Sequence, residues 1–236
     1  MTAVTVGGII AAGEGRRLRD AGFTAPKPLV TVAGVPLVEG VVRNFLAAGI
    51  VSLTVIVNED EEDCVRWLRA RFPALDIRFI VRTTASSLES FGRVLAAAPA
   101  GPIVISTVDA WCRPEDFARF VEAAGRCPAG AVVLAVTPLV EDEKPLWATL
   151  DEDGRISRLG GETGNVVTAG IYLVPERARA LTPPPGLGRL REYLAWLVSR
   201  GEMVYGVRID RVVDVDRAAD VALAEAMARE FSGGAV

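Results

Sequence analysis

Residues 5–18 read Thr-Val-Gly-Gly-Ile-Ile-Ala-Ala-Gly-Glu-Gly-Arg-Arg-Leu. The stretch joins a short apolar run, Val4–Ala11, to a glycine-containing loop that carries arginines. Such a run predicts a strand that is buried on both faces, which is typical of a parallel sheet covered by helices. In open α/β sheets, ligands bind at the carboxyl ends of the strands, so this loop is the first place to look for a site.

Further apolar runs rich in Val and Ile follow along the chain, and they alternate with segments of helical periodicity. The runs predict strands at 53–57, 77–81, 103–108, 131–136 and 166–174. The periodic segments predict helices at 35–48, 60–71, 86–97 and 114–124. This alternation predicts an α/β doubly wound fold with helices on both faces of the sheet.

The regular alternation of predicted strands and helices ends after residue 137. Segments 147–150 and 155–159 flank the turn Asp151-Glu-Asp-Gly154, which predicts a β-hairpin. A helix at 190–199, a strand at 203–209 and a last helix from about 217 to 230 follow. We expect a single domain, residues 1–236, whose second half is modified.

Composition excludes several classes of function. The net charge is −4 at pH 7, so a nucleic-acid-binding protein is not expected. The chain has no histidine, which removes imidazole catalysis and His-based metal sites. Its three cysteines, at 64, 112 and 127, have no Cys-x-x-Cys spacing, and no apolar run is long enough to span a bilayer. We therefore expect a cytoplasmic protein without a membrane partner.

The loop after the first strand suits a phosphate group. Gly13 and Gly15 let backbone N–H groups approach a polyphosphate, and Arg16 and Arg17 place positive charge beside them. A tight turn with solvated arginines is the alternative. Leu18 stands where the dinucleotide fingerprint needs a glycine, and no lysine precedes position 27, so neither a Rossmann dehydrogenase nor a Walker loop fits.

Lys27 is one of only two lysines, the other being Lys144, in a chain otherwise rich in arginine. It lies between Pro26 and Pro28, whose fixed φ angles stiffen the backbone. A stiff mount of this kind suits a cation that must be held in one position.

Three segments together, Ala11-Ala-Gly-x-Gly-x-Arg17-Leu, Pro26-Lys27-Pro-Leu and Gly34-x-Pro36-Leu, resemble the signature of the sugar-1-phosphate nucleotidylyltransferases and their alcohol-phosphate cytidylyltransferase relatives. The resemblance implies a Rossmann-like, mostly parallel mixed sheet. It implies Mg²⁺-dependent transfer of a nucleoside monophosphate from an NTP to a sugar-1-phosphate or small alcohol phosphate, with release of pyrophosphate.

The resemblance also implies a division of labour along the chain. Residues 1–136 would form a nucleotide-binding half and residues 137–236 an acceptor-binding half. Lys27 and Arg17 would be catalytic. The nucleotide would contact the first loop at Ala11, Ala12, Gly13, Gly15 and Arg16.

Acidic residues supply the implied metal ligands. Asp109 follows the strand predicted at 103–108, and it resembles the family aspartate that holds Mg²⁺. Asp214 and Asp216 resemble the late acidic motif that gives a second ligand, and their spacing puts both on one side of an extended segment. The alternatives are a turn cap for Asp109 and a helix N-cap for Asp216, with Asp220 structural in either case.

Two later segments resemble substrate loops of the family. Thr83, Thr84 and Ser86 fall in the loop that contacts the nucleobase; the alternative is a helix cap at Ser86 or Ser87. For the acceptor, Gly170 lies in a strand resembling one that approaches the sugar, and Glu162 precedes it. Thr163 replaces the lysine that grips the sugar phosphate in many members, and Lys144 is a candidate substitute or a solvated residue.

Two other functions remain open on the sequence. The chain could be a catalytically inactive nucleotide-binding regulatory module, although Arg17, Lys27 and Asp109 are intact. It could also be a guanylyltransferase that acts on molybdopterin, which shares the early motif. The expected partners are an NTP and a phosphorylated sugar or alcohol, and assembly into a homo-oligomer is left open.

Overall fold

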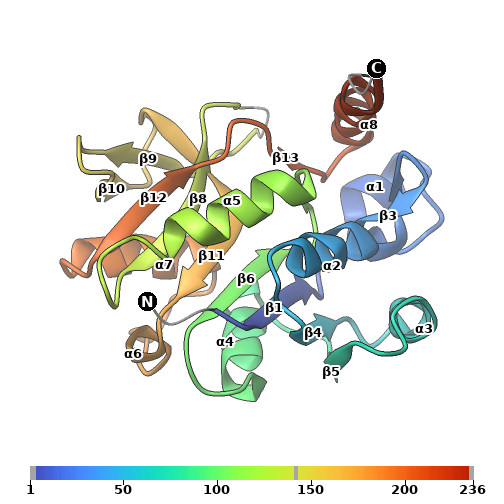
Figure 1. The fold of residues 1–236 in the computed structure, drawn as a ribbon, viewed down its shortest axis with the longest axis horizontal. Helices are drawn as coiled ribbons and strands as arrows, with labels where there is room; N and C mark the ends of the chain where they lie inside the picture. Colours follow the sequence, from blue (N-terminus) through green and yellow to red (C-terminus); the bar gives the residue numbers. More distant parts are fainter. Residues whose placement is uncertain (1–3, 141–142, 234–236) are drawn as a thin grey trace.

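A nine-stranded mixed sheet forms the centre of the computed structural model, which describes residues 4–140 and 143–233 (Figure 1). In its first half, β1 (Val6–Ala11) lies between β6 (Ile103–Thr107) and β4 (Ser52–Val57), and β5 (Asp76–Val81) forms the edge beyond β4. All three pairings are parallel. The carboxyl ends of these strands therefore meet at one edge, as the sequence predicted.

The second half of the chain extends the same sheet. The strand β11 (Val166–Val174) runs antiparallel to β6, to β8 (Val132–Thr137) and to β9 (Trp147–Leu150). The predicted hairpin is confirmed, because β9 pairs antiparallel with β10 (Ile156–Leu159). The strand β12 (Val204–Arg208) pairs in parallel with β8.

Helices cover both faces of the sheet, which confirms the α/β doubly wound prediction. One buried apolar cluster contains side chains of α2 (Leu37–Ala47), α3 (Glu62–Arg71) and α5 (Pro114–Ala124). The other contains those of α4 (Ser87–Ala97) and α7 (Leu190–Ser199). In the first cluster the rings of Phe45 and Phe117 meet edge to face, with centroids 4.9 Å apart.

Two glycines within β1 let these layers approach closely. A Cβ on Gly7 would lie 2.7 Å from the ring of Phe45 in α2, and one on Gly8 would lie 2.5 Å from Cγ1 of Val94 in α4. Any side chain here would push a helix away from the sheet. The Val-Gly-Gly-Ile segment is thus a packing requirement of the central strand.

Several short elements depend on contacts that no local pattern predicts. The helix expected from residue 35 begins at Leu37, because β3 (Val35–Pro36) pairs with β2 (Thr31–Val32). The chain also forms α1 (Arg16–Asp20), a 3₁₀ turn η1 (Lys27–Leu29) and α6 (Glu176–Arg179). The strand β7 (Ala110–Trp111) pairs with β13 (Val213–Asp214) across the fold.

The last helix, α8 (Ala218–Gly233), lies beside the N-terminal elements α1 and β3 (Figure 1, upper right). Its apolar residues Val221, Ala224 and Met227 belong to the same buried cluster as Leu18 and Val30. This packing carries residues 213–216 to the carboxyl edge of β1 and β6. Within the described residues, no helix has both the length and the apolar character that crossing a membrane requires.

Candidate active site

The loop between β1 and α1 presents backbone N–H groups to solvent. Gly15 has φ +60°, and a Cβ there would lie 2.6 Å from Cβ of Lys27, so conformation and space both require glycine. Among the described residues, the amides of Gly13, Glu14 and Gly15 donate to no protein acceptor. These amides are free to bind an anion.

Lys27 lies directly beneath this loop, and only 7% of its side chain is exposed. Its ammonium donates to Oδ2 of Asp109 at 2.6 Å and to Oδ1 of Asp216. Burial by itself would lower the pKa of Lys27, but the two carboxylates outweigh burial and raise it above its usual value. Lys27 is therefore a fixed positive charge at neutral pH.

Asp109 lies just after the end of β6. Its backbone carbonyl accepts a hydrogen bond from the N–H of Val215 at 3.0 Å, which ties it to the segment before α8. Burial raises the pKa of this carboxyl, yet the Lys27 charge and hydrogen bond, with the Thr107 hydroxyl, bring the pKa below its usual range. The side chain is thus ionised and directed at the ammonium. The turn-cap alternative for Asp109 does not describe these contacts.

Asp216 joins the same cluster from the segment before α8. Its Oδ2 accepts Nη1 of Arg17 at 2.8 Å, and its Oδ1 accepts the Lys27 ammonium. The helix-capping hydrogen bonds are made by Asp220, whose Oδ2 accepts the backbone N–H groups of Asp216 and Arg217 at 3.1 and 2.7 Å. Across residues 143–233, as the structure describes them, the side chain of Asp216 does not cap the helix. Asp220 therefore has the structural role expected of it, and the carboxylate of Asp216 faces the site.

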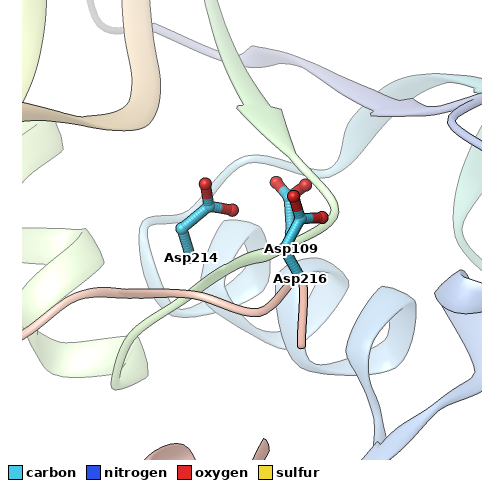
Figure 2. Close-up of side chains that lie close together, drawn as sticks. All are labelled: Asp109, Asp214 and Asp216. Carbon is cyan, nitrogen blue, oxygen red and sulfur yellow. The ribbon is translucent and has the colours of Figure 1, made fainter. Parts of the chain in front are cut away.

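Asp109, Asp214 and Asp216 could together hold a metal ion (Figure 2). One oxygen from each lies within 4.8 Å of the others. Two ligands on opposite sides of Mg²⁺ are about 4.2 Å apart, so a small closure would suffice. All three ligands are carboxylate oxygens, which Mg²⁺ prefers, and the site needs no histidine.

A cavity of about 230 Å³ opens beside these carboxylates, between β6, β11 and the start of α7. Asp109 and Asp214 line it, as does Gly170. Its other polar side chains are two arginines, Arg189 and Arg191, and five hydroxyl-bearing residues, Ser87, Thr107, Thr137, Thr168 and Tyr172. Leu139, Leu146 and Leu190 give it apolar walls.

Residues 7–169 match the family model described as the MobA-like NTP transferase domain. The chain belongs to this family. A bifunctional IPC transferase and DIPP synthase from Rubrobacter xylanophilus is 33% identical to this NTP transferase domain over 239 residues, 93% of this chain and 51% of the relative. A mannose-1-phosphate guanyltransferase from Gibberella zeae is 28% identical over 181 residues, 70% of this chain and 48% of that protein. The domain thus spans about half the length of these curated relatives.

Solved structures with the same fold include the inositol-1-phosphate CTP transferase from T. maritima, with a TM-score of 0.84 and 18% identity. That alignment covers 100% of this NTP transferase domain and 99% of the other chain. A UDP-glucose pyrophosphorylase complexed with UDP-glucose has a TM-score of 0.76 at 14% identity, covering 97% of this chain and 99% of the other. At these identities the likeness shows the fold, and it confirms the Rossmann-like α/β prediction.

The loop predicted to meet the nucleobase follows β5 in this NTP transferase domain. The hydroxyl of Thr83 donates to Oδ1 of Asn58 at 3.1 Å, and Thr84 shares a 2.7 Å hydrogen bond with Ser90. Ser86 is the N-cap of α4, where its Oγ accepts the N–H of Glu89 at 3.1 Å. The capping alternative therefore describes the side chain of Ser86, and the Ala85 N–H is also bound, to Oε2 of Glu89 at 2.8 Å.

The predicted first-loop residues lie at the carboxyl end of β1. Ala11 and Ala12 are buried, Gly13 is exposed, and Arg16 points to solvent as the partner of Glu14. Arg17 is the loop arginine that reaches the carboxylate cluster.

Glu162 and Lys144, the two side chains predicted to reach the acceptor, are exposed, and neither lines the cavity in the part of the chain that the structure describes. The carbonyl of Lys144 accepts Nη1 of Arg191 at 3.0 Å. Sequence reasoning missed Arg189 and Arg191. In so arginine-rich a chain no local signal distinguishes these two, and only the placement of α7 reveals them.

Proposed function

We propose that this domain transfers a nucleoside monophosphate from an NTP to a small phosphorylated sugar or alcohol and releases pyrophosphate. One observation carries the proposal. Lys27, Arg17 and the three carboxylates meet at a single point, between the open amides of the first loop and the cavity.

The reaction needs charge neutralisation more than proton transfer. An oxygen of the acceptor phosphate attacks the α-phosphorus, a new P–O bond forms, and the bond to the β-phosphate breaks as pyrophosphate leaves. The attacking oxygen is already anionic, so no general base is required. Lys27 would neutralise the α-phosphate, while Arg17 and the first-loop amides would hold the β- and γ-phosphates.

Asp109 and Asp214, with Asp216, would hold Mg²⁺, the divalent ion that suits an all-carboxylate set. When bound there, Mg²⁺ would neutralise phosphate charge and orient the triphosphate. Asp214 is exposed and lines the cavity, which supports a ligand role between nucleotide and acceptor.

The size of the cavity favours a small acceptor. Drug-sized ligands occupy pockets of about 300–1,000 Å³, and this one holds about 230 Å³. A phosphorylated polyol or sugar ring suits that space better than a bulky pterin. Arg189 and Arg191 would bind the acceptor phosphate, and the threonine hydroxyls would bind its alcohol groups. Gly170 would give the acceptor a close approach to β11, and contacts from Glu162 and Lys144 remain predictions.

The remaining assignments belong to the same proposal. Residues 1–136 would bind the nucleotide, with Thr83, Thr84 and the backbone near Ser86 at the base, and residues 137–236 would bind the acceptor. The three cysteines are unpaired thiols, which supports a reducing compartment such as the cytoplasm.

A pyrophosphate-release assay tests the proposal. Each of the four NTPs is combined with panels of sugar phosphates, polyol phosphates and a pterin, with Mg²⁺. We expect turnover with one NTP and a small phosphorylated acceptor, and Lys27→Met should lower kcat about 10²–10³-fold. Arg229→Met, at an exposed position on α8, is the control variant. NTP binding without pyrophosphate release under any acceptor would favour the inactive-module alternative.

A kinetic split tests the acceptor assignment. Arg191→Met should raise KM for the acceptor and leave KM for the NTP unchanged, because Arg191 lies in the cavity and away from the first loop. An equal rise in both KM values would contradict the assignment.

A further inference from the structure

The ammonium of Lys27 binds carboxylates of the acidic cluster that would hold a divalent ion. It contacts two of the three carboxylates that could ligate such an ion, Asp109 and Asp216. Asp216 is also held by Arg17, so each of its two oxygens already accepts from a cation. A metal ion on Asp216 would therefore share an oxygen with one of these cations, and repulsion between the two positive charges favours withdrawal of one side chain.

We propose that Lys27 and the divalent ion compete for this acidic cluster. Lys27 is its resident cation in the metal-free protein, and it leaves the carboxylates when the ion arrives with the triphosphate. This inference rests on the proposed function.

Charge balance favours exchange over coexistence. The carboxylates of Asp109 and Asp216 face the two cations Lys27 and Arg17, so the charges of these four groups already balance. A divalent ion inserted beside the ammonium would place like charges within a few ångströms, and Lys27, only 7% exposed, has little water around it to screen their repulsion. Arg17 is 48% exposed and can turn into water, whereas Lys27 is 7% exposed and cannot.

Lys27 consequently needs a second anionic partner before it can leave. A Cβ on Gly15 would lie 2.6 Å from Cβ of Lys27 and 3.6 Å from its Cδ, so the lysine side chain runs past the loop with the open amides. A triphosphate on those amides would offer Lys27 that partner. The metal alone should then bind weakly, and the metal and the polyphosphate should strengthen each other's binding.

Metal binding tests the competition directly. Mn²⁺ is titrated by calorimetry or electron paramagnetic resonance into the folded full chain without nucleotide. We expect Lys27→Met to bind Mn²⁺ about tenfold or more tightly than the wild type, since it removes the competing charge. Lys144→Met, which removes the only other lysine charge, is the matched control and should bind like the wild type. Lys27→Gln repeats the measurement if the Met variant does not fold.

Adding inorganic tripolyphosphate separates competition from a general effect of net charge. It should tighten Mn²⁺ binding to the wild type much more than to Lys27→Met, because only the wild type must move an ammonium. Unchanged or weaker Mn²⁺ binding by Lys27→Met, or equal gains in both lysine variants, would overturn the inference. In that case wild-type pyrophosphate release would still leave the proposed function standing, whereas no release and no Mn²⁺ binding in any variant would remove both.

The two lysines also allow a direct spectroscopic readout. With ¹⁵N-labelled lysine, the side-chain nitrogens of Lys27 and Lys144 should give two signals, assigned by the two Met variants. Mg²⁺ with tripolyphosphate should shift the Lys27 signal and leave the Lys144 signal in place. A Lys27 signal that stays unchanged while the metal binds would show that the ion pairs persist, and would refute the exchange.

Discussion

Neutralising the two carboxylates that hold Lys27, those of Asp109 and Asp216, should destabilise the fold more than neutralising them together with Lys27. In Asp109→Asn/Asp216→Asn the ammonium stays 7% exposed without an anionic partner, while the carboxylates it loses are 22% and 36% exposed in the wild type. Removing one side of a buried ion pair costs about 3–5 kcal/mol. The Asn oxygens still accept hydrogen bonds, so we expect the lower end, about 3 kcal/mol.

The triple variant Lys27→Met/Asp109→Asn/Asp216→Asn should recover most of that loss, since exchanging a buried ion pair for neutral groups is often about neutral in free energy. Urea unfolding in the presence of a chelator measures the free energy of unfolding. For a chain of this size, 3 kcal/mol corresponds to a fall in Tm of about 6–12 °C. Asp63→Asn/Asp210→Asn, at two exposed positions, is the control and should change little.

The decisive comparison is between the double and triple variants. If they are equally unstable, the unpaired ammonium is not the cause, and the account of Lys27 as a buried charge held by two carboxylates is refuted. If the double variant is as stable as the wild type, the ammonium reaches water and the burial argument fails.

Three further predictions concern particular residues. Gly15→Ala should lower the free energy of unfolding by about 1–2 kcal/mol, because φ is +60° and the new Cβ would meet Lys27, whereas Gly13→Ala, with open space around it, should change stability less; urea unfolding of the pair checks this. Arg179 donates to the carbonyls of Leu95, Ala98, Pro99 and Gly101 at the end of α4, so Arg179→Met should cost about 2–3 kcal/mol, and an unchanged urea midpoint would contradict that role. Glu61 is buried with an unpartnered oxygen, and burial raises its pKa to about 7. Since the folded state then holds a proton that the unfolded state has lost, the contribution of Glu61 to stability should fall by about 3 kcal/mol as the pH rises from 4.5 through 7, and comparing Glu61→Gln with the wild type in chemical unfolding at each pH measures that difference.

Much of the sheet could be predicted because its strands carry their own signal. The apolar runs ending at Ala11, Val57 and Val81 are strands, and the turn 151–154 joins a hairpin. The predicted helix boundaries were less accurate where residues at a helix end pair with another segment, as Val35–Pro36 do with Thr31–Val32. A two-residue strand has too few residues to show a period, so β7 and β13 left no trace in the sequence pattern.

The candidate site, too, could be predicted only in part from the sequence. Lys27 could be singled out by its rarity and its flanking prolines, and Asp109 by its place after a strand. The contact between Lys27 and Asp216 joins residues 189 positions apart, and it depends on how α8 packs. Arg189 and Arg191 reach the cavity only because α7 begins there.

The sequence by itself determined the order of strands and helices, the open glycine loop and the identity of the residues that resemble the family signature, because each is written in neighbouring residues. The tertiary structure alone decided which charges meet. An ammonium and three carboxylates come together because three segments meet at one edge of the sheet: the end of β6, residues 213–216 and the turn at Lys27. Such a meeting depends on long-range packing, which a local pattern does not encode.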